Sequence, residues 1–359
     1  MMNTYVIIMA GGIGSRFWPV SKKSMPKQFL DVMGVGQSLI QLTYNRFAKN
    51  YDKDKILVVT NTEYKDLVME HLPELQESQI LLEPSAKNTA PCIAFASFRI
   101  NAIDPDANCI VAPSDHIILD GQSFNENLTK ALKFVENNSA LVTLGIKPSR
   151  PDTGYGYIQY FAEDLGDNVH KVKLFTEKPD EEIAKQFIDS GDFLWNAGIF
   201  VWNNRTIMDA IKNYLPDTFE LFSKRDQDFG KANEQAFINE IYPLCKNISI
   251  DYGIMEKAEN VYIIPSEFGW SDLGTWKSLY KEREVNEEGN VIHGNRCMVY
   301  DSKDSLVFSN SDKLVVVNGV ENLMIIDSGE VLMVSSLDKE QEVKKIVADV
   351  KNKYKDYYS

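Results

Sequence analysis

The chain has 359 residues, 44% of them hydrophobic and 25% charged, which is enough apolar material for one large and one small domain. Its formal net charge of −14 argues against nucleic acid as a partner. No apolar run reaches membrane-spanning length and the N-terminus lacks the features of a signal peptide, so we expect a cytoplasmic protein without a membrane partner.

A glycine-rich loop follows the first predicted strand, residues 5–9, which are continuously apolar. Gly11, Gly12 and Gly14 allow a tight turn whose backbone N–H groups can form a concave anion site. Arg16 and Lys27 follow, and residues 1–30 contain four cations and no carboxylate in an acidic chain. This pattern indicates a polyphosphate-binding loop.

The residues of this loop match two other glycine-rich nucleotide-binding motifs less well. A dinucleotide-binding fingerprint needs a third glycine where Phe17 stands, and a Walker A loop needs a Gly-Lys-Ser/Thr sequence that this loop lacks. The glycines alone are equally compatible with an ordinary turn of an α/β protein. The cluster of cations is what favours a phosphate site.

Helices and strands alternate over the following residues. Apolar spacing predicts helices over residues 38–49, 62–72 and 121–138, and short apolar runs predict strands over residues 55–60, 80–82 and 141–145. This alternation indicates an α/β fold with a Rossmann-like sheet that is mixed, mostly parallel and flanked by helices. Such sheets bind ligands at the carboxyl ends of their strands.

Polar residues near these strand ends have two interpretations each. Asn88 or Thr89 could cap the apolar helix that follows or face a ligand. Asp115 and Asp272 are typical of turns, but one or two carboxylates with substrate phosphates also suffice to bind Mg²⁺. Four scattered histidines predict no histidine metal site, and four cysteines without paired spacing predict reduced thiols (Cys92, Cys109, Cys245 and Cys297).

The second half of the chain has similar ambiguities. Gly154 and Gly156 in an aromatic strand indicate either a bulge or a close approach to a ligand. Glu177 and Lys178 before a helix are typical of a solvated surface, although a lysine also suits a sugar-phosphate oxygen. Asp251 could cap a helix or face a sugar.

From residue 290 the pattern changes to short strands separated by turn residues. Strands over residues 297–300, 306–308, 314–317, 323–326 and 331–334 predict a small β-rich domain, followed by a helix from about residue 338 with one apolar stripe. We predict a catalytic domain over residues 1–285 and a C-terminal domain over residues 286–359, and we expect residues 290–359 to carry none of the chemistry.

Taken together, the motifs resemble the sugar-1-phosphate nucleotidylyltransferase family. Residues 10–16 and 26–29 are similar to its signature, residues 17–19 resemble its mannose-1-phosphate guanylyltransferase branch, and matching blocks recur as far as Trp276. The resemblance implies that GTP and mannose 1-phosphate react to give GDP-mannose and pyrophosphate, with Mg²⁺ as cofactor. It also implies a partial left-handed β-helix in the C-terminal domain and a homo-oligomer, most simply a dimer. We expect no counterpart of the cupin domain that longer bacterial relatives add.

The resemblance also assigns a role to each matching residue. Arg16 and Lys27 would hold the triphosphate and the departing pyrophosphate, and Lys178 the attacking phosphate. The remaining nucleotide-binding residues would be Ala10, Gly11, Gly12, Gly14, Ser15, Glu83, Pro84, Asn88, Thr89 and Ala90. The sugar would contact Gly156, Glu177, Asn196 and Asp251, and the metal Asp115 and Asp272.

Other functions remain as alternatives to this hypothesis. A related enzyme could use another base or another sugar 1-phosphate. A non-catalytic regulatory subunit that binds nucleotide sugars should have lost some of the five charged residues, yet all are present (Arg16, Lys27, Asp115, Lys178 and Asp272). A nicotinamide dehydrogenase would need the glycine fingerprint that this chain lacks.

Overall fold

The computed structural model describes residues 3–358, and contacts divide the chain into two units. The sheet unit contains the residues up to Gly11, Thr43–Ser114 and Ile118–Trp270. The C-terminal unit contains Gly12–Leu42, Asp115–Ile117 and the residues from Ser271 onward. The predicted division into residues 1–285 and 286–359 stays a prediction.

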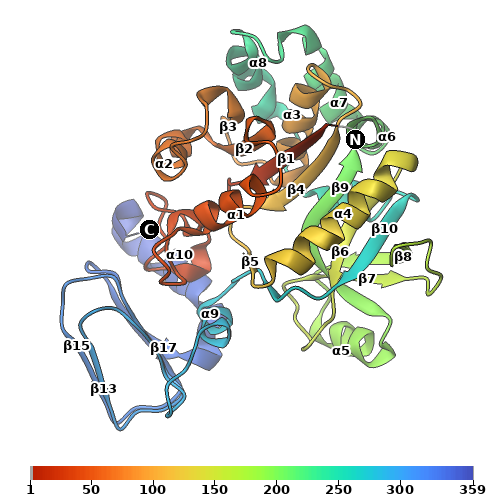
Figure 1. Cartoon of the computed structure of the whole chain (residues 1–359). Helices are drawn as coiled ribbons and strands as arrows, with labels where there is room; N and C mark the ends of the chain where they lie inside the picture. Colours follow the sequence, from red (N-terminus) through yellow and green to blue (C-terminus); the bar gives the residue numbers. More distant parts are fainter. Residues whose placement is uncertain (1–2, 359) are drawn as a thin grey trace. The chain divides into compact units, whose positions relative to one another are not determined.

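A nine-stranded sheet forms the sheet unit, in the order β3-β2-β1-β4-β9-β6-β10-β8-β7 (Figure 1). Its strands are β1 (Thr4–Met9), β2 (Ile56–Asn61), β3 (Ile80–Glu83), β4 (Asn108–Pro113), β6 (Leu141–Ile146), β7 (Gly156–Tyr160), β8 (His170–Glu177), β9 (Phe193–Asn203) and β10 (Val261–Ser266). Strands β1 to β4 pair in parallel, as do β6 and β10, whereas β9 runs antiparallel to β4 and β6. The predicted α/β fold is therefore confirmed. The sheet is mixed and less parallel than expected, because its described strands make four parallel and five antiparallel pairings.

Helices accompany the sheet, and several of them pack directly against its strands. They are α1 (Leu39–Ala48), α2 (Lys65–His71), α3 (Thr89–Asn101), α4 (Gly121–Asn137), α5 (Glu181–Ser190), α6 (Asn204–Tyr214), α7 (Pro216–Ser223) and α8 (Glu234–Ile241). Tyr5 and Ile7 of β1 share a core with α3, while Val6 and Ile8, which point to the opposite face, are also buried. Helix α4 crosses β6, β9 and β10 (Figure 1). Burial on both faces explains the continuously apolar sequence of β1.

The C-terminal unit contains two small sheets made of the short strands predicted from the sequence. Strands β12 (Val291–His293), β14 (Leu306–Ser309), β16 (Leu323–Asp327) and β17 (Leu332–Ser336) form one, and β13 (Cys297–Tyr300) and β15 (Val315–Asn318) the other. Val307 and Ile325 of the first sheet pack with Val317 of the second. Helix α9 (Trp276–Glu282) precedes these strands and α10 (Val343–Tyr354) follows them. The strands β5 (Ile117–Ile118) and β11 (Trp270–Ser271) contain boundaries between the two units.

Trp276 lies at the centre of the core of the C-terminal unit. Its ring lies 4.8 Å from that of Phe17 and 5.2 Å from that of Phe308, measured between ring centroids. Its indole N–H donates to the carbonyl of Trp18 at 3.0 Å. Val343, the first residue of α10, is buried in the same core. The aromatic residues after the glycine loop therefore anchor that loop to α9, β14 and α10.

Two further findings concern the chemistry and the environment of the chain. All four cysteines are free thiols, and Cys92, Cys109 and Cys245 are buried, as predicted. Over residues 3–358, no helix combines the length and the apolar character needed to cross a lipid bilayer.

Candidate active site

A pocket of about 290 Å³ in the C-terminal unit brings together the predicted phosphate and metal residues. It is lined by Gly14, Ser15, Arg16, Phe17, Lys27, Asp115, His116, Asp272, Leu273, Gly274 and Lys344. Six of these residues are site residues predicted from the sequence: Gly14, Ser15, Arg16, Lys27, Asp115 and Asp272. These six residues come from three segments that are distant in the sequence, and the three meet in one pocket.

The glycine loop needs Gly14 for a steric reason. Its φ of 72° is in the left-handed region, and a Cβ at this position would lie 2.4 Å from the Cβ of Lys27. The loop is tied to the Lys27 segment by the backbone, since the N–H of Lys27 donates to the carbonyl of Ile13 at 3.1 Å. The 3-10 turn Ser15–Phe17, which carries Arg16, follows directly.

Lys27 connects the two predicted metal-binding segments. Its Nζ donates to Oδ2 of Asp115 at 2.9 Å and to the main-chain carbonyl of Asp272 at 2.7 Å, and its side chain is only 4% exposed. Burial acts to raise the pKa of Asp115, but the charge of Lys27, the neighbouring His116 and the Lys27 hydrogen bond outweigh it, so the pKa is lowered. Asp115 is therefore a carboxylate at neutral pH.

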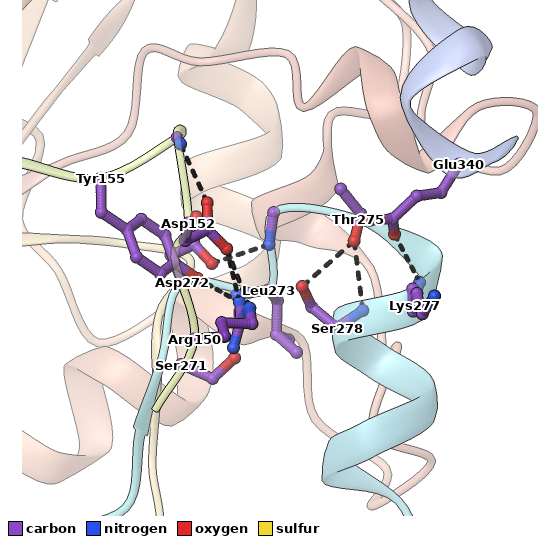
Figure 2. Close-up of polar contacts among 12 residues, drawn as sticks. Arg150, Asp152, Tyr155, Ser271, Asp272, Leu273, Thr275, Lys277, Ser278 and Glu340 are labelled. Atoms are coloured by element: carbon purple, nitrogen blue, oxygen red, sulfur yellow. Dashed lines mark hydrogen bonds and ion pairs between the residues drawn. The ribbon is translucent and has the colours of Figure 1, made fainter. Parts of the chain in front are cut away.

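The carboxylate of Asp272 is oriented by the turn before α9. Its Oδ1 accepts from the N–H of Gly274 at 3.0 Å. Figure 2 shows the next residues of this turn, where Oγ1 of Thr275 accepts from the N–H of Ser278 at 3.1 Å and caps the helix. The turn thus fixes the position of Asp272 at the pocket.

Arg16 has an unused hydrogen-bond donor. Its Nε is buried and has no hydrogen-bond partner among the described residues. Because an unsatisfied buried donor costs about 1–3 kcal/mol, a ligand that accepts a hydrogen bond would be favoured here. A phosphate oxygen has the charge and the acceptor capacity to do so.

The pocket fits a metal ion that shares its ligands with a substrate. Among residues 3–358, no three His, Cys, Asp or Glu side chains gather to hold a metal by themselves. Asp115 and Asp272 supply two carboxylates to the same pocket. Since Mg²⁺ is usually bound by one or two carboxylates together with substrate phosphates, this donor set suits Mg²⁺.

In the sheet unit, Glu83 lies at the carboxyl end of β3 next to Gly11. The side chain is only 5% exposed, and a Cβ on Gly11 would lie 2.9 Å from its Oε2. The hydroxyl of Tyr242 donates to Oε1. Burial raises the pKa of Glu83 to about 7, although the bond from Tyr242 opposes this. Tyr242 was not predicted, because no sequence pattern distinguishes it from the other aromatic residues of this helical region.

The next predicted nucleotide-binding residues have structural roles. Asn88 caps α3, and its side chain accepts from the N–H of Thr89 at 2.9 Å. Oγ1 of Thr89 accepts from the N–H of Ile250 at 2.8 Å, and the N–H of Ala90 donates to the carbonyl of Ile248. The capping interpretation of Asn88 is thus confirmed, and the segment lies beside the residues before Asp251.

Three other predicted nucleotide-binding residues lie outside this segment. The carbonyl of Ala10 accepts from Oγ1 of Thr60, Pro84 is half-buried, and Gly12 is exposed in the C-terminal unit.

The four predicted sugar-binding residues lie together. Nδ2 of Asn196 donates to Oδ1 of Asp251 at 2.9 Å. Asp251 does not cap the helix as the sequence allowed, because it is the first residue of the helix Asp251–Met255 and Ile250 stands at the cap position. Gly156 of β7 is paired with Glu177 of β8. A Cβ on Gly156 would lie 3.3 Å from the Cβ of Asn196. Lys178 forms an ion pair with Glu177, and its own side chain is 55% exposed.

Arg150 forms a second cluster that the sequence did not indicate. Its guanidinium carbon lies 5.3 Å from the ring of Trp195 and 5.7 Å from that of Tyr155. Its Nε donates to Asp152 at 3.0 Å (Figure 2). The sequence around this cluster is Arg150-Pro151-Asp152, which predicts a turn and not a site.

We expect that the substitution Asp251→Asn stabilises the protein at alkaline pH. Burial and the nearby Glu177 raise the pKa of Asp251 to about 7 from an ordinary value of 3.8. A raised carboxyl pKa means that wild-type stability falls as the pH rises from about 4 to about 7. Thermal unfolding should therefore show that the substitution adds about 2–3 kcal/mol more to the free energy of unfolding at pH 8 than at pH 5. The exposed Asp189→Asn is the control, and an equal effect at both pH values would contradict the prediction.

A glycine turn after a β-strand, a buried lysine and two carboxylates are the parts of a nucleotidyl-transfer site. The nucleotidyl transferase family model matches residues 5–288, and the model of the MannoseP isomerase/GMP-like beta-helix domain matches residues 295–350. The chain therefore belongs to the nucleotidyl transferase family and is a nucleotidyltransferase. Members of this family generally use divalent metal ions.

Characterised relatives narrow this class further. The chain is 36% identical to a mannose-1-phosphate guanylyltransferase of Salmonella muenchen, over 97% of this chain and 73% of the relative. It is 33% identical to a mannose-1-phosphate guanylyltransferase of Escherichia coli K12, over 97% and 73% respectively. A crystal structure from Thermus thermophilus, described as a mannose-1-phosphate geranyltransferase, has a TM-score of 0.87 at 29% identity and covers 98% of this chain and all of that one. The predicted family and fold class are thus confirmed.

Proposed function

We propose that this nucleotidyltransferase transfers a guanylyl group from GTP to mannose 1-phosphate and forms GDP-mannose and pyrophosphate. The observation that carries the proposal is the pocket in which Arg16, Lys27 and two carboxylates meet. The similarity to mannose-1-phosphate guanylyltransferases supports the choice of base and sugar.

In the proposed reaction, an oxygen of the sugar phosphate forms a bond to the α-phosphorus of GTP. The bond from that phosphorus to the oxygen bridging to the β-phosphate breaks, and pyrophosphate leaves with the electron pair. Since no protein nucleophile is needed, positioning and charge stabilisation supply the catalysis. Arg16 and Lys27 bind the triphosphate and the leaving pyrophosphate, and Lys178 binds the attacking phosphate.

Asp115 and Asp272 are the residues that would hold Mg²⁺. When bound, the ion neutralises phosphate charge and helps to align the reacting groups. Lys27 contributes at the same place by holding Asp115 ionised and fixing it against the backbone of Asp272.

The remaining contacts follow the predicted residue sets. Glu83 reads the guanine, and the residues that follow it in the chain line the base and ribose: Pro84, Asn88, Thr89 and Ala90. The backbone of the glycine loop binds phosphate oxygens of the nucleotide, through Ala10, Gly11, Gly12, Gly14 and Ser15. Gly156, Glu177, Asn196 and Asp251 bind the sugar hydroxyls. A cytoplasmic location and a homodimer are the accompanying proposals, the latter checked by light scattering.

A pyrophosphate-release assay over GTP, ATP, UTP and dTTP with mannose 1-phosphate and glucose 1-phosphate tests the proposal. We expect the highest kcat/KM for GTP with mannose 1-phosphate in the presence of Mg²⁺. A higher kcat/KM for another pair would replace the base or the sugar in the proposal. Binding of nucleotide sugars without turnover of any pair would favour the regulatory alternative.

The substitution Lys178→Met should separate the two phosphate sites. The Lys178 side chain forms an ion pair with Glu177. Because the lysine is also partly exposed, an anionic acceptor can reach its ammonium. We expect the KM for mannose 1-phosphate to rise by about 10- to 100-fold, as for a lost charge-assisted hydrogen bond, with GTP affinity nearly unchanged.

Lys178→Arg is the matched control, because it keeps the charge next to Glu177. It should retain most of the affinity for the sugar phosphate. If Lys178→Met instead lowers GTP affinity while the KM for mannose 1-phosphate holds, Lys178 binds the nucleotide phosphates.

A further inference from the structure

One cation of the phosphate pocket comes from the last helix of the chain. Lys344, the second residue of α10, lines the pocket together with Arg16, Lys27, Asp115 and Asp272. Its place in the pocket differs from our expectation that the C-terminal residues take no part in the chemistry. That expectation arose because the sequence of α10 shows only an apolar stripe with lysines between its members.

The packing of α10 explains why this lysine stays at the pocket. Val343 precedes it and is buried in the core that also contains Phe17 and Trp276. Glu340, in the turn before α10, accepts from the N–H of Lys277 at 3.1 Å, which ties this end of the helix to α9 (Figure 2). The start of α10 is thus held against the same residues that anchor the glycine loop.

The other two cations of the pocket, Arg16 and Lys27, do not by themselves make its side chains net positive. Lys27 donates two of the three hydrogen bonds that its ammonium can make, one to Asp115 and one to the carbonyl of Asp272. With two carboxylates present, Arg16 and Lys27 only bring the formal side-chain charge of the pocket to neutrality. Lys344 makes the formal charge of the pocket side chains positive before any Mg²⁺ is counted, which favours an anionic polyphosphate.

We propose that Lys344 is a further phosphate-binding residue of this pocket and that it contacts the pyrophosphate portion of the nucleotide. The inference rests on the proposed nucleotidyl transfer, which makes pyrophosphate a product. Lys344 is solvent-exposed, and its long flexible side chain can follow the leaving group while its stem stays on the helix.

The test uses the full chain and compares Lys344→Met with Lys345→Met. The two lysines are adjacent and both exposed, but they point about 100° apart around the helix. Calorimetric titration with inorganic pyrophosphate should show a loss of affinity of about 3- to 30-fold for Lys344→Met and less than about 2-fold for Lys345→Met. The KM for GTP should rise in parallel, while the KM for mannose 1-phosphate should not change.

Lys344→Arg keeps the charge and should bind pyrophosphate nearly as well as wild type, so a loss in Lys344→Met alone cannot come from altered packing. Lys344→Met should also show a weaker dependence of pyrophosphate affinity on salt concentration. Equal pyrophosphate affinity in the two methionine variants would overturn the role of Lys344. A wild-type protein that binds pyrophosphate but shows no turnover with any nucleotide and sugar phosphate would instead overturn the proposed function.

Discussion

Asp115→Asn and Asp272→Asn are each expected to lower kcat by at least about 100-fold, the scale of a lost stabilisation of transition-state charge. Both carboxylates line one pocket, and Lys27 keeps Asp115 ionised. An asparagine keeps the shape of the side chain but removes the charge. Steady-state turnover at saturating Mg²⁺ measures the effect.

The two variants should differ in nucleotide binding. Asp115→Asn frees the ammonium of Lys27 from its carboxylate, so the KM for GTP should stay level or fall while kcat falls. Asp272→Asn leaves the Lys27–Asp115 ion pair in place. The exposed Asp349→Asn of the same unit is the control. A variant that turns over near the wild-type rate would remove its residue from the metal site.

Glu83→Gln should change the choice of base. The Watson–Crick edge of guanine presents two adjacent donors, which a carboxylate can accept together, whereas a glutamine amide would place its own N–H₂ against one of them. An unpaired buried polar group costs about 1–3 kcal/mol, so kcat/KM for GTP should fall by about 5- to 150-fold. ATP and UTP should lose far less, and the ratio between nucleotides is the quantity to measure.

Tyr242→Phe provides a matched test of the same idea. Burial raises the pKa of Glu83 to about 7 even though the Tyr242 hydroxyl, which donates to its Oε1, acts to lower it. Without that bond the pKa should rise further, so the use of GTP should fall at pH 7 and recover at higher pH. Since each carboxylate oxygen has two acceptor sites, the bond from Tyr242 leaves Oε1 able to accept from guanine as well.

An unchanged GTP preference in Glu83→Gln would assign base recognition to backbone groups near Asn88 and Thr89.

Local patterns predicted most of the secondary structure. The strand at residues 306–308 and the helix at residues 121–138 agree with β14 and α4 to within a residue, because apolar periodicity records which side faces the core. The last helix was less well predicted: residues 337–342 form a 3-10 turn, and α10 begins only at Val343. Helix boundaries depend on capping and packing as well as on periodicity.

Part of the candidate site could also be predicted from the sequence. Gly14, Arg16 and Lys27 formed a recognisable cationic loop, and the family motifs pointed to Asp115 and Asp272. These signals are short and local, since a tight turn and a strand end leave characteristic residue types. No local signal marked Tyr242, Arg150 or Lys344, whose roles depend on neighbours far away in the sequence.

Periodicity and residues adjacent in the chain were enough to predict the α/β class, the family and a glycine loop suited to phosphate. The folded chain was needed to show that Lys27 donates to Asp115, that Tyr242 donates to a buried Glu83, and that α10 adds Lys344 to the pocket. The physical reason is that charge pairing, burial and pKa depend on distances between side chains. Those distances exist only once Trp276, Phe17 and Val343 have packed distant segments into one core.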